Sequence, residues 1–248
     1  MKAIIMAGGK GTRISDPSYP IPKVLREAAG KPLLQYVLNT IDDYHKEDIT
    51  IIVGFMKEQV MKAFPGYRYA VQEQQLGTGH AVMCAIEADQ LESYEGDVII
   101  LSGDVPMISK KTIQEMTEMH TAHNNDCTML TCVSDEDDSL GRIIRQGGVV
   151  AGIVEAKDCT PEQHKITEKN AGLYIFNCQS LCKSIKNIKT GNNQGEYYLT
   201  DVPKLLIDEG KRVEAYITED KRELMGVNTL ENLIQVEKIL KGMNNGTK

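Results

Sequence analysis

The chain has 248 residues, of which 41% are hydrophobic and 25% are charged, and its formal net charge is -7. This is the composition of a folded globular protein, and it excludes intrinsic disorder. The surplus of negative charge argues against nonspecific nucleic-acid binding, which depends on Lys and Arg side chains facing phosphates. An anionic ligand would have to meet a local basic cluster, and Lys10, Arg13 and Lys23 near the N-terminus form such a cluster in the sequence.

The apolar runs do not indicate a signal peptide or a membrane-spanning helix, and the cysteines do not indicate a zinc site. The first apolar run is short and ends in a glycine-rich loop, unlike a signal peptide. No run approaches the roughly 20 apolar residues that a membrane-spanning helix needs. The six cysteines have neither C-x-x-C nor zinc-site spacing, so we expect reduced, mostly buried thiols. We expect a cytoplasmic protein that binds neither a membrane nor nucleic acid.

In the first part of the chain, apolar strands alternate with helical segments. Strands rich in Ile and Val are predicted at residues 3–6, 49–53, 69–71 and 98–101. Between the first two strands, apolar residues recur at the spacing of one helix face, after a proline that a helix start tolerates: Pro32, Leu34, Val37, Leu38 and Ile41. This alternation predicts βαβ units and a mostly parallel sheet that is buried on both faces.

The pattern changes after residue 104. Strands are predicted at residues 127–133, 142–145 and 149–154, with a tight turn at Gln146-Gly147-Gly148 between the last two. We expect these strands to form a small β-hairpin lobe carried on the sheet. Strands at 172–176 and 213–217 and a helix at 230–240 then return to the α/β pattern. The predicted fold class is a three-layer, Rossmann-like α/β fold with a mostly parallel sheet.

A glycine-rich loop follows the first predicted strand. The run Ala7-Gly8-Gly9-Lys10-Gly11-Thr12-Arg13 is followed by Lys23, with nine residues between Arg13 and Lys23. At the carboxyl end of a parallel strand, glycines let backbone N–H groups approach phosphate oxygens. The loop is not a Walker motif, because Lys10 is followed by Gly11 rather than Ser or Thr. It is not a dinucleotide fingerprint either, because Ile14 stands where a third small residue is needed.

Taken singly, several polar residues also have ordinary structural explanations. Arg13 and Lys23 can be solvated loop charges, and Gln72 can be an exposed member of a glutamine-rich run. Asp104 follows a predicted strand and can cap a turn, while Asn228 can be the N-cap of the last helix. These residues alone leave structural and functional roles open.

Further motifs occur along the chain in a fixed order. They are Gln72-Glu73-Gln74-Gln75-Leu76-Gly77-Thr78-Gly79-His80-Ala81, Gly103-Asp104-Val105-Pro106, Gly141-Arg142-Ile143, Ile153-Val154-Glu155-Ala156-Lys157-Asp158, Asn170-Ala171-Gly172, Gln194-Gly195-Glu196-Tyr197-Tyr198-Leu199-Thr200-Asp201 and Gly226-Val227-Asn228. With the glycine-rich loop, they resemble the sugar-phosphate nucleotidyltransferases over about residues 3–240. The resemblance is strongest to the uridylyltransferase domain of bacterial bifunctional N-acetylglucosamine-1-phosphate uridylyltransferases.

This resemblance implies a reaction, a metal and a set of site residues. A sugar-1-phosphate would attack the α-phosphorus of UTP, giving UDP-N-acetylglucosamine for cell wall biogenesis and releasing pyrophosphate. The implied catalytic residues are Arg13, Lys23 and Asp104. Mg²⁺, with Mn²⁺ or Co²⁺ as substitutes, would bind Asp104 and Asn228. The nucleotide would contact Ala7, Gly8, Gly9, Gly11, Thr12, Gln72, Gly77 and Thr78, and the sugar Gly103, Gly141, Glu155, Asn170 and Thr200.

The resemblance also implies a division of the chain. We expect a single nucleotidyltransferase domain over residues 1–248, with a nucleotide-binding part at about 1–108, a sugar-binding part at about 109–228 and a C-terminal helix at about 229–242. The acetyltransferase β-helix of the bifunctional proteins has no counterpart here, since there are no hexapeptide repeats, so we expect no acetyltransferase activity. The oligomeric state is left open.

Three departures from the family pattern leave the choice of substrate open. The segment 14–22 is longer than the resemblance predicts, Ser102 stands where an aromatic residue is common, and Ala171 stands where Thr is common. The alternatives are a nucleotidyltransferase for another sugar-1-phosphate or another base, such as glucose-1-phosphate with UTP or dTTP, and a nucleotide-sugar-binding protein without turnover.

Overall fold

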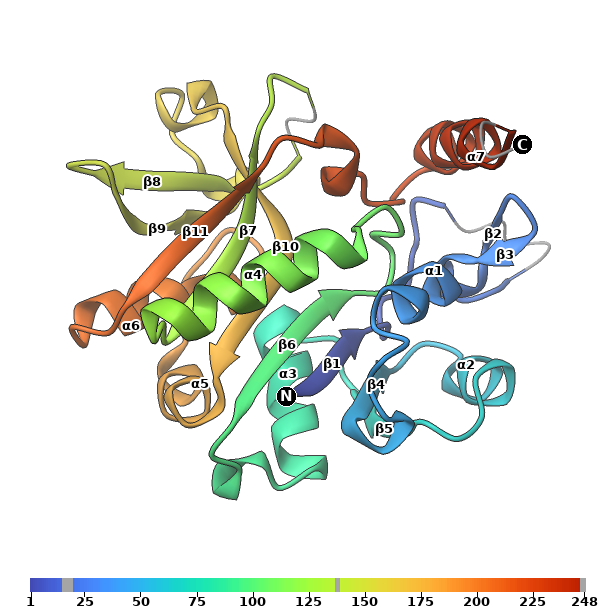
Figure 1. Ribbon diagram of the computed structural model, residues 1–248, viewed down its shortest axis with the longest axis horizontal. Helices are drawn as coiled ribbons and strands as arrows, with labels where there is room; N and C mark the ends of the chain where they lie inside the picture. The colour runs from blue at the N-terminus through green and yellow to red at the C-terminus, as the bar shows by residue number, and fades with distance from the viewer. Residues whose placement is uncertain (15–19, 137–138, 246–248) are drawn as a thin grey trace.

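One mixed sheet forms the centre of the computed structural model, which describes residues 1–14, 20–136 and 139–245 (Figure 1). Its strand order is β11-β7-β10-β6-β1-β4-β5. The strands are β1 (Lys2–Met6), β4 (Ile49–Val53), β5 (Arg68–Val71), β6 (Asp97–Ser102), β7 (Cys127–Val133), β10 (Glu168–Asn177) and β11 (Val213–Thr218). β10 is antiparallel to β6 and β7, and the other strands on this path run in one direction. The predicted mostly parallel α/β sheet is confirmed.

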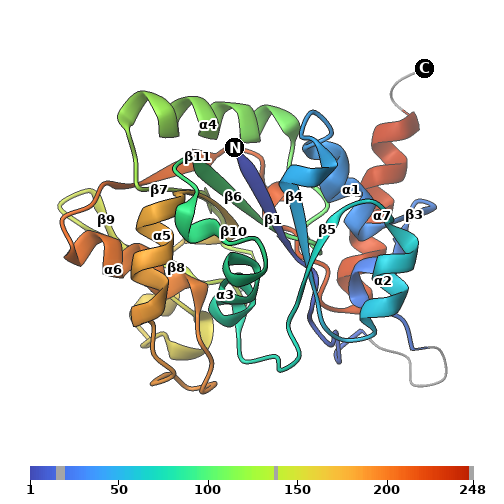
Figure 2. The ribbon, with the colours of Figure 1, turned by 90° about the horizontal axis from the view of Figure 1, so that it is seen from below.

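Helices cover both faces of the sheet, because successive strand residues point to opposite sides and both sets are apolar. Ile5 and Ile99 pack in one hydrophobic core, and Ile4 and Ile100 pack in the other. Helices α1 (Leu33–Thr40), α2 (Lys57–Ala63) and α4 (Lys110–His123) cover the first face, and α3 (Thr78–Ala88), α5 (Cys178–Ser184) and α6 (Val202–Asp208) cover the second. Figure 2 shows α4 on one side of the sheet and α3, α5 and α6 on the other.

The hairpin lobe is smaller than the sequence predicts. Strands β8 (Arg142–Gln146) and β9 (Val149–Val154) form it, joined by Gly147 and Gly148, whose φ angles of 58° and 85° suit a two-residue hairpin turn. The prediction that residues 127–133 belong to this lobe is wrong, because they form β7 inside the main sheet. All residues of β7 except Val133 are buried, so this strand needs cover on both faces.

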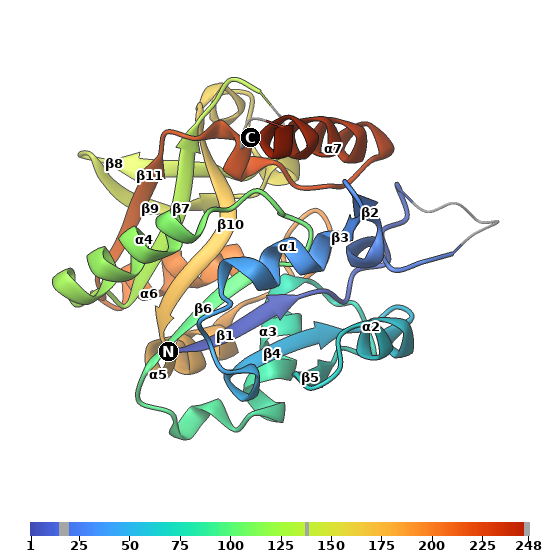
Figure 3. The same ribbon diagram turned by 45° about the vertical axis from the view of Figure 1, so that its right-hand side comes forward.

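The C-terminal helix lies against a second, two-stranded sheet. Helix α7 (Leu230–Asn245) packs on β2 (Glu27–Ala28), which pairs with β3 (Lys31–Pro32), as Figure 3 shows. Ala28 and Val236 share a small core there. This packing brings the residues before α7 close to the segment that follows the glycine-rich loop.

No helix in the described ranges has both the length and the apolar character that crossing a membrane requires.

Candidate active site

The carboxyl ends of the parallel strands meet at one edge of the sheet, where α/β proteins bind ligands. Backbone hydrogen bonds continue past the strand ends there: Ala7 N donates to Ile52 O (2.9 Å), Gly103 N to Met6 O (2.9 Å) and Gln72 N to Val53 O (2.8 Å). A cavity of about 560 Å³ opens at this edge. Its lining includes predicted nucleotide-binding and catalytic residues, namely Ala7, Gly8, Gly9, Gly11, Thr12, Lys23, Gln72, Gly77, Thr78 and Asp104.

Four polar side chains converge beside the glycine-rich loop. Lys23 Nζ donates to Asp104 Oδ2 and, at 3.0 Å, to Asn228 Oδ1. Arg13 Nη2 donates to the same Asn228 Oδ1 at 3.3 Å. The side chains of Lys23 and Asp104 keep 16% and 17% of their surface exposed, so water and small ligands reach this cluster. The fold thus brings together two cations, a carboxylate and an amide oxygen from three distant parts of the sequence.

The side-chain oxygens of Asp104 and Asn228 are not used for helix capping or for a turn. Thr229, rather than Asn228, caps α7, because its Oγ1 accepts a hydrogen bond from Asn232 N at 3.2 Å. The carboxylate of Asp104 faces Lys23, and it is the backbone oxygen of Asp104 that accepts a hydrogen bond from Val227 N at 2.8 Å. Both side-chain oxygens are therefore free of the turn and capping roles that the sequence left open.

These oxygens fit a divalent cation. Asp104 Oδ2 and Asn228 Oδ1 both contact one ammonium group, so a single positive ion can reach both. A carboxylate and an amide oxygen are ligands that Mg²⁺ accepts, usually together with phosphate oxygens and water. Within the described residues no group of three or more His, Cys, Asp and Glu side chains could hold a metal. A cation bound here would therefore share its coordination with a ligand.

Gln72 is buried rather than exposed. It keeps only 4% of its surface, and its Nε2 contacts Gly77 O at 3.0 Å and His80 Nδ1 at 3.1 Å. These two partners engage the amino group and leave Oε1 facing Gly8, at which an added Cβ would lie 3.3 Å away. The arrangement presents the amide oxygen of Gln72 as an acceptor beside the glycine-rich loop. His80 thus holds the amide of Gln72.

The sequence analysis missed two residues of the cavity wall, Gln75 and Glu196. Lys10, from the predicted basic cluster, and Ser102 also line the cavity. Gln75 has a sequence signal, because it lies in the same glutamine-rich motif as Gln72, and its Nε2 donates to Gln72 O at 3.1 Å. Glu196 lies in the motif at residues 194–201, in which the sequence analysis gave a role only to Thr200.

The glutamine-rich motif and the Gln194–Asp201 motif lie in direct contact. Tyr197 N donates to Leu76 O, and Gly79 N donates to Tyr197 O, both at 2.8 Å. Gly77, with φ of 110°, lies so close that an added Cβ would be 2.4 Å from Tyr197 O. Only glycine fits at this position without moving the backbone.

Four of the five predicted sugar-binding residues form two pairs that do not line the cavity. Thr200 Oγ1 donates to Glu155 Oε1 at 2.8 Å, and Asn170 N donates to Gly141 O at 2.9 Å. The amide of Asn170 is engaged internally, because Nδ2 donates to the Tyr174 hydroxyl at 2.7 Å and Oδ1 accepts from Gly172 N at 3.3 Å. The fifth predicted residue, Gly103, adjoins Ser102 and Asp104 at the cavity.

Because the Glu155 carboxyl is buried, we expect the unfolding free energy to depend on pH. Desolvation, helped by the nearby carboxylates of Asp158, Asp201 and Glu196, raises the pKa of Glu155 above 4.5. The folded chain then binds a proton that the unfolded chain has released, so folding is less favourable once the pH exceeds the ordinary glutamate value. We expect the unfolding free energy of wild type, relative to Glu155→Gln, to fall as the pH rises from below 4.5. Urea unfolding of both chains from pH 4 to about 7 measures this, and a pH-independent difference contradicts it.

Comparison with known proteins agrees with this geometry. Residues 2–238 match the family model described as nucleotidyl transferase. The chain is 41% identical over 247 residues to the bifunctional protein GlmU of Clostridium perfringens, covering 99% of this chain and 53% of that protein. It is 39% identical over 239 residues to the bifunctional protein GlmU of Desulfitobacterium hafniense, covering 96% and 51%. The chain spans about half the length of these curated relatives.

A solved structure shows the same fold. It is described as a glucose-1-phosphate thymidylyltransferase from Bacillus anthracis in complex with sucrose, and it superposes with a TM-score of 0.78 at 19% identity, over 96% of this chain and 94% of that one. At this identity the likeness concerns the fold alone. With a family match over nearly the whole length and a glycine-rich loop beside converging cations and oxygens, the chain belongs to the nucleotidyl transferase family.

Proposed function

We propose that this chain transfers a uridylyl group from UTP to N-acetylglucosamine-1-phosphate, producing UDP-N-acetylglucosamine and pyrophosphate. The observation that carries the proposal is the cluster of Arg13, Lys23, Asp104 and Asn228 beside the glycine-rich loop. The similarity to the two bifunctional GlmU proteins supports the choice of base and sugar.

The reaction needs alignment and charge neutralisation more than a protein nucleophile. An oxygen of the sugar phosphate attacks the α-phosphorus, and the bond from that phosphorus to the bridging oxygen of the β-phosphate breaks as pyrophosphate leaves in line. Lys23 would contact the phosphates around the reacting centre, and Arg13 would meet the leaving β- and γ-phosphates. Backbone N–H groups of the glycine-rich loop would hold the triphosphate.

Asp104 and Asn228 would hold Mg²⁺, or Mn²⁺ or Co²⁺ in its place, and such a cation supplies charge stabilisation for the phosphate oxygens. Other residues of the chain would bind the base and the sugar. The buried amide of Gln72 would read the uracil edge, because an amide oxygen can accept from uracil N3–H. Glu155, Asn170 and Thr200 would bind the sugar, with Gly103 and Gly141 approaching it through their backbone.

The test is pyrophosphate release in magnesium, across UTP, dTTP, CTP, ATP and GTP combined with N-acetylglucosamine-1-phosphate and glucose-1-phosphate. We expect release to be strongest with UTP and N-acetylglucosamine-1-phosphate. Preference for another pair would retain nucleotidyl transfer and replace the substrates, and Ser102 at the cavity wall would then be the first residue to vary. Folded protein that releases no pyrophosphate with any pair would refute the proposal and favour a binding protein without turnover.

A change at Gln72 should affect base recognition selectively. Gln72→Leu keeps the size of the side chain but removes the acceptor, and a buried hydrogen-bonding group left without its partner weakens binding by about 10- to 100-fold. We expect kcat/KM for UTP to fall by that factor, mainly through KM. Gln74→Leu, an exposed neighbour in the same motif, is the matched control and should leave kcat/KM near wild type. Equal effects of the two substitutions would remove Gln72 from base recognition.

A further inference from the structure

A buried carboxylate outside the site ties two segments of the chain together. Glu223, in the 3-10 helix η8 (Lys221–Leu224), keeps only 1% of its surface exposed. Its Oε1 accepts hydrogen bonds from Ser109 N at 2.9 Å and from Thr112 Oγ1 at 2.7 Å. Burying a carboxylate is costly unless donors meet its charge, and these donors lie at the N-terminus of α4, where the helix dipole also favours a negative group.

The two joined segments each carry one oxygen of the candidate metal site. Asp104 lies five residues before Ser109, and Asn228 lies five residues after Glu223. A second tie connects the same segments closer to the site, where Val227 N donates to Asp104 O at 2.8 Å. Asp104 and Asn228 therefore project from two segments that are fastened to each other at two points.

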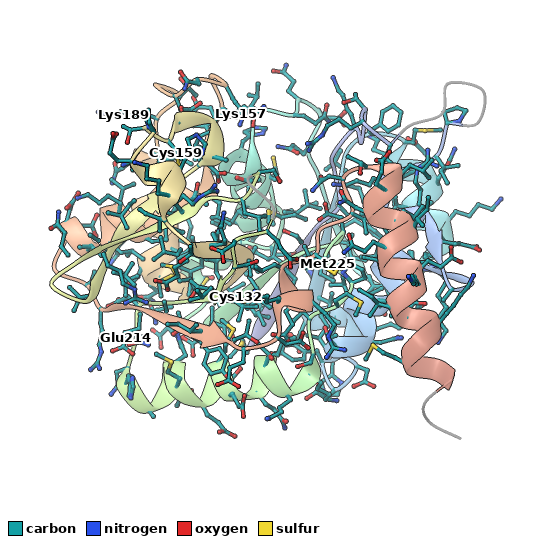
Figure 4. All side chains as sticks on the ribbon, turned by 90° about the horizontal axis from the view of Figure 1, so that it is seen from above. Cys132, Lys157, Cys159, Lys189, Glu214 and Met225 are labelled. Carbon is teal, nitrogen blue, oxygen red and sulfur yellow. The ribbon has the colours of Figure 1, made fainter. Side chains whose placement is uncertain are left out.

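Close packing links these hydrogen bonds to the positions of Asp104 and Asn228. An added Cβ at Gly226 would lie 3.3 Å from Asn228 Nδ2 and 3.8 Å from a methyl carbon of Val105, so the segment after η8 passes directly over the one that follows β6. Met225, labelled in Figure 4 beside α7, packs against the small core that contains Val227 and Val236. A displacement of η8 would therefore move Asn228 relative to Asp104.

We propose that Glu223 is a positioning residue, which sets the separation of Asp104 and Asn228 so that one divalent cation reaches both oxygens. The inference rests on the proposed metal site and adds a residue that touches neither substrate nor metal. Partners that orient metal ligands typically change metal affinity by about 10- to 100-fold when they are removed. Loss of the Glu223 carboxylate should act in this way, through the geometry of the two ligands.

The experiment is Mn²⁺ binding to the nucleotide-free chain, followed by the electron paramagnetic resonance signal of free Mn²⁺. We expect Glu223→Ala to weaken Mn²⁺ binding by at least about 10-fold. Glu223→Gln retains an acceptor oxygen for Ser109 N and Thr112 Oγ1, so its affinity should stay close to wild type. Lys23, whose ammonium group contacts the same two oxygens in the wild-type structure, is retained in all of these variants.

A matched control separates positioning from a general loss of stability. Asp89 has a side chain that is only 5% exposed, and it ties distant segments by accepting from Arg68 Nε at 2.6 Å and from the Thr50 hydroxyl. Asp89→Ala should lower the unfolding free energy in urea but leave Mn²⁺ affinity unchanged. If Glu223→Ala proves too unstable to fold, Thr112→Val removes only one of the two donors, and it should weaken Mn²⁺ binding measurably.

The results distinguish the inference from the proposal on which it rests. If folded Glu223→Ala or Thr112→Val binds Mn²⁺ as tightly as wild type, the positioning role is overturned and the proposed metal site stands. An equal loss of affinity in Asp89→Ala would also overturn it, because the effect would then follow from stability. Wild type and Asp104→Ala binding Mn²⁺ equally well would overturn the metal site itself, and with it the inference, before any Glu223 variant is measured.

Discussion

Asp104→Ala is expected to remove nucleotidyl transfer while the chain stays folded. The carboxylate lies beyond the end of β6, next to the cavity, and its side chain contacts Lys23 rather than the core. Its removal takes away one of two oxygens proposed to hold the divalent cation, so charge in the transition state loses its stabilisation. We expect kcat with UTP and N-acetylglucosamine-1-phosphate to fall by at least about 1000-fold, measured as pyrophosphate release in magnesium.

The controls for Asp104 separate metal binding from charge and stability. Asp104→Asn keeps an oxygen but loses the negative charge, so it should show a smaller loss that higher Mg²⁺ or Mn²⁺ concentrations partly restore. Asp42→Ala removes an exposed carboxylate that pairs with Lys110 at 2.5 Å, and it should leave kcat unchanged. Near-normal turnover by Asp104→Ala in magnesium would show that the metal assignment is wrong.

Lys23→Ala should lower kcat much more than it weakens nucleotide binding. Lys23 Nζ contacts both Asp104 and Asn228, and an added Cβ at Gly11 of the glycine-rich loop would lie 2.9 Å from the Cβ of Lys23, so the lysine stands where the reacting phosphate is expected. A cation that acts mainly on the transition state changes kcat, whereas one that only holds the substrate changes KM. We expect kcat to fall by about 100- to 1000-fold, with KM for UTP changing far less.

Two further variants complete the test of Lys23. Lys23→Arg keeps the charge but replaces a compact ammonium with a planar group, so it should recover only part of the lost turnover. Lys57→Ala removes a half-buried lysine that pairs with Glu73 at 2.7 Å, and it should match wild type in both kcat and KM. A rise in KM alone for Lys23→Ala would limit Lys23 to ground-state binding.

Strand positions were predictable where apolar, β-branched runs end at turn residues. The predicted bounds 49–53, 127–133 and 149–154 are those of β4, β7 and β9. Strand direction was not predictable, because the antiparallel placement of β10 depends on pairing with β6 and β7, which no local pattern records. The same limit explains why β7 was assigned to the hairpin lobe.

The start of β10 was missed for a chemical reason. The predicted strand began at residue 172, but β10 begins at Glu168. Its first residues are polar, which is typical of a loop, and the fold satisfies them through partners that the sequence does not reveal. Arg145 Nε, for example, donates to Glu168 Oε2 at 2.6 Å.

The sequence located the motifs around the candidate site but not the contacts between them. Glycines after a strand and an aspartate after another strand indicate one sheet edge, which is where the structure places Gly9 and Asp104. The hydrogen bonds of Asn228 with Lys23, and of Glu223 with Ser109, join residues more than one hundred positions apart. Such contacts depend on the packing of α4 and α7, and no spacing rule within a motif predicts them.

The close approach of Gly77 to Tyr197 has a consequence for protein engineering. The loop that faces the expected base and the loop that leads to Thr200 are fitted to each other at the backbone, with no space for even one added carbon atom. A segment covering residues 72–79 taken from a relative with another base preference would therefore meet a mismatched neighbour. Grafts that exchange residues 72–79 and 194–201 together should fold and retain turnover more often than grafts of either segment alone.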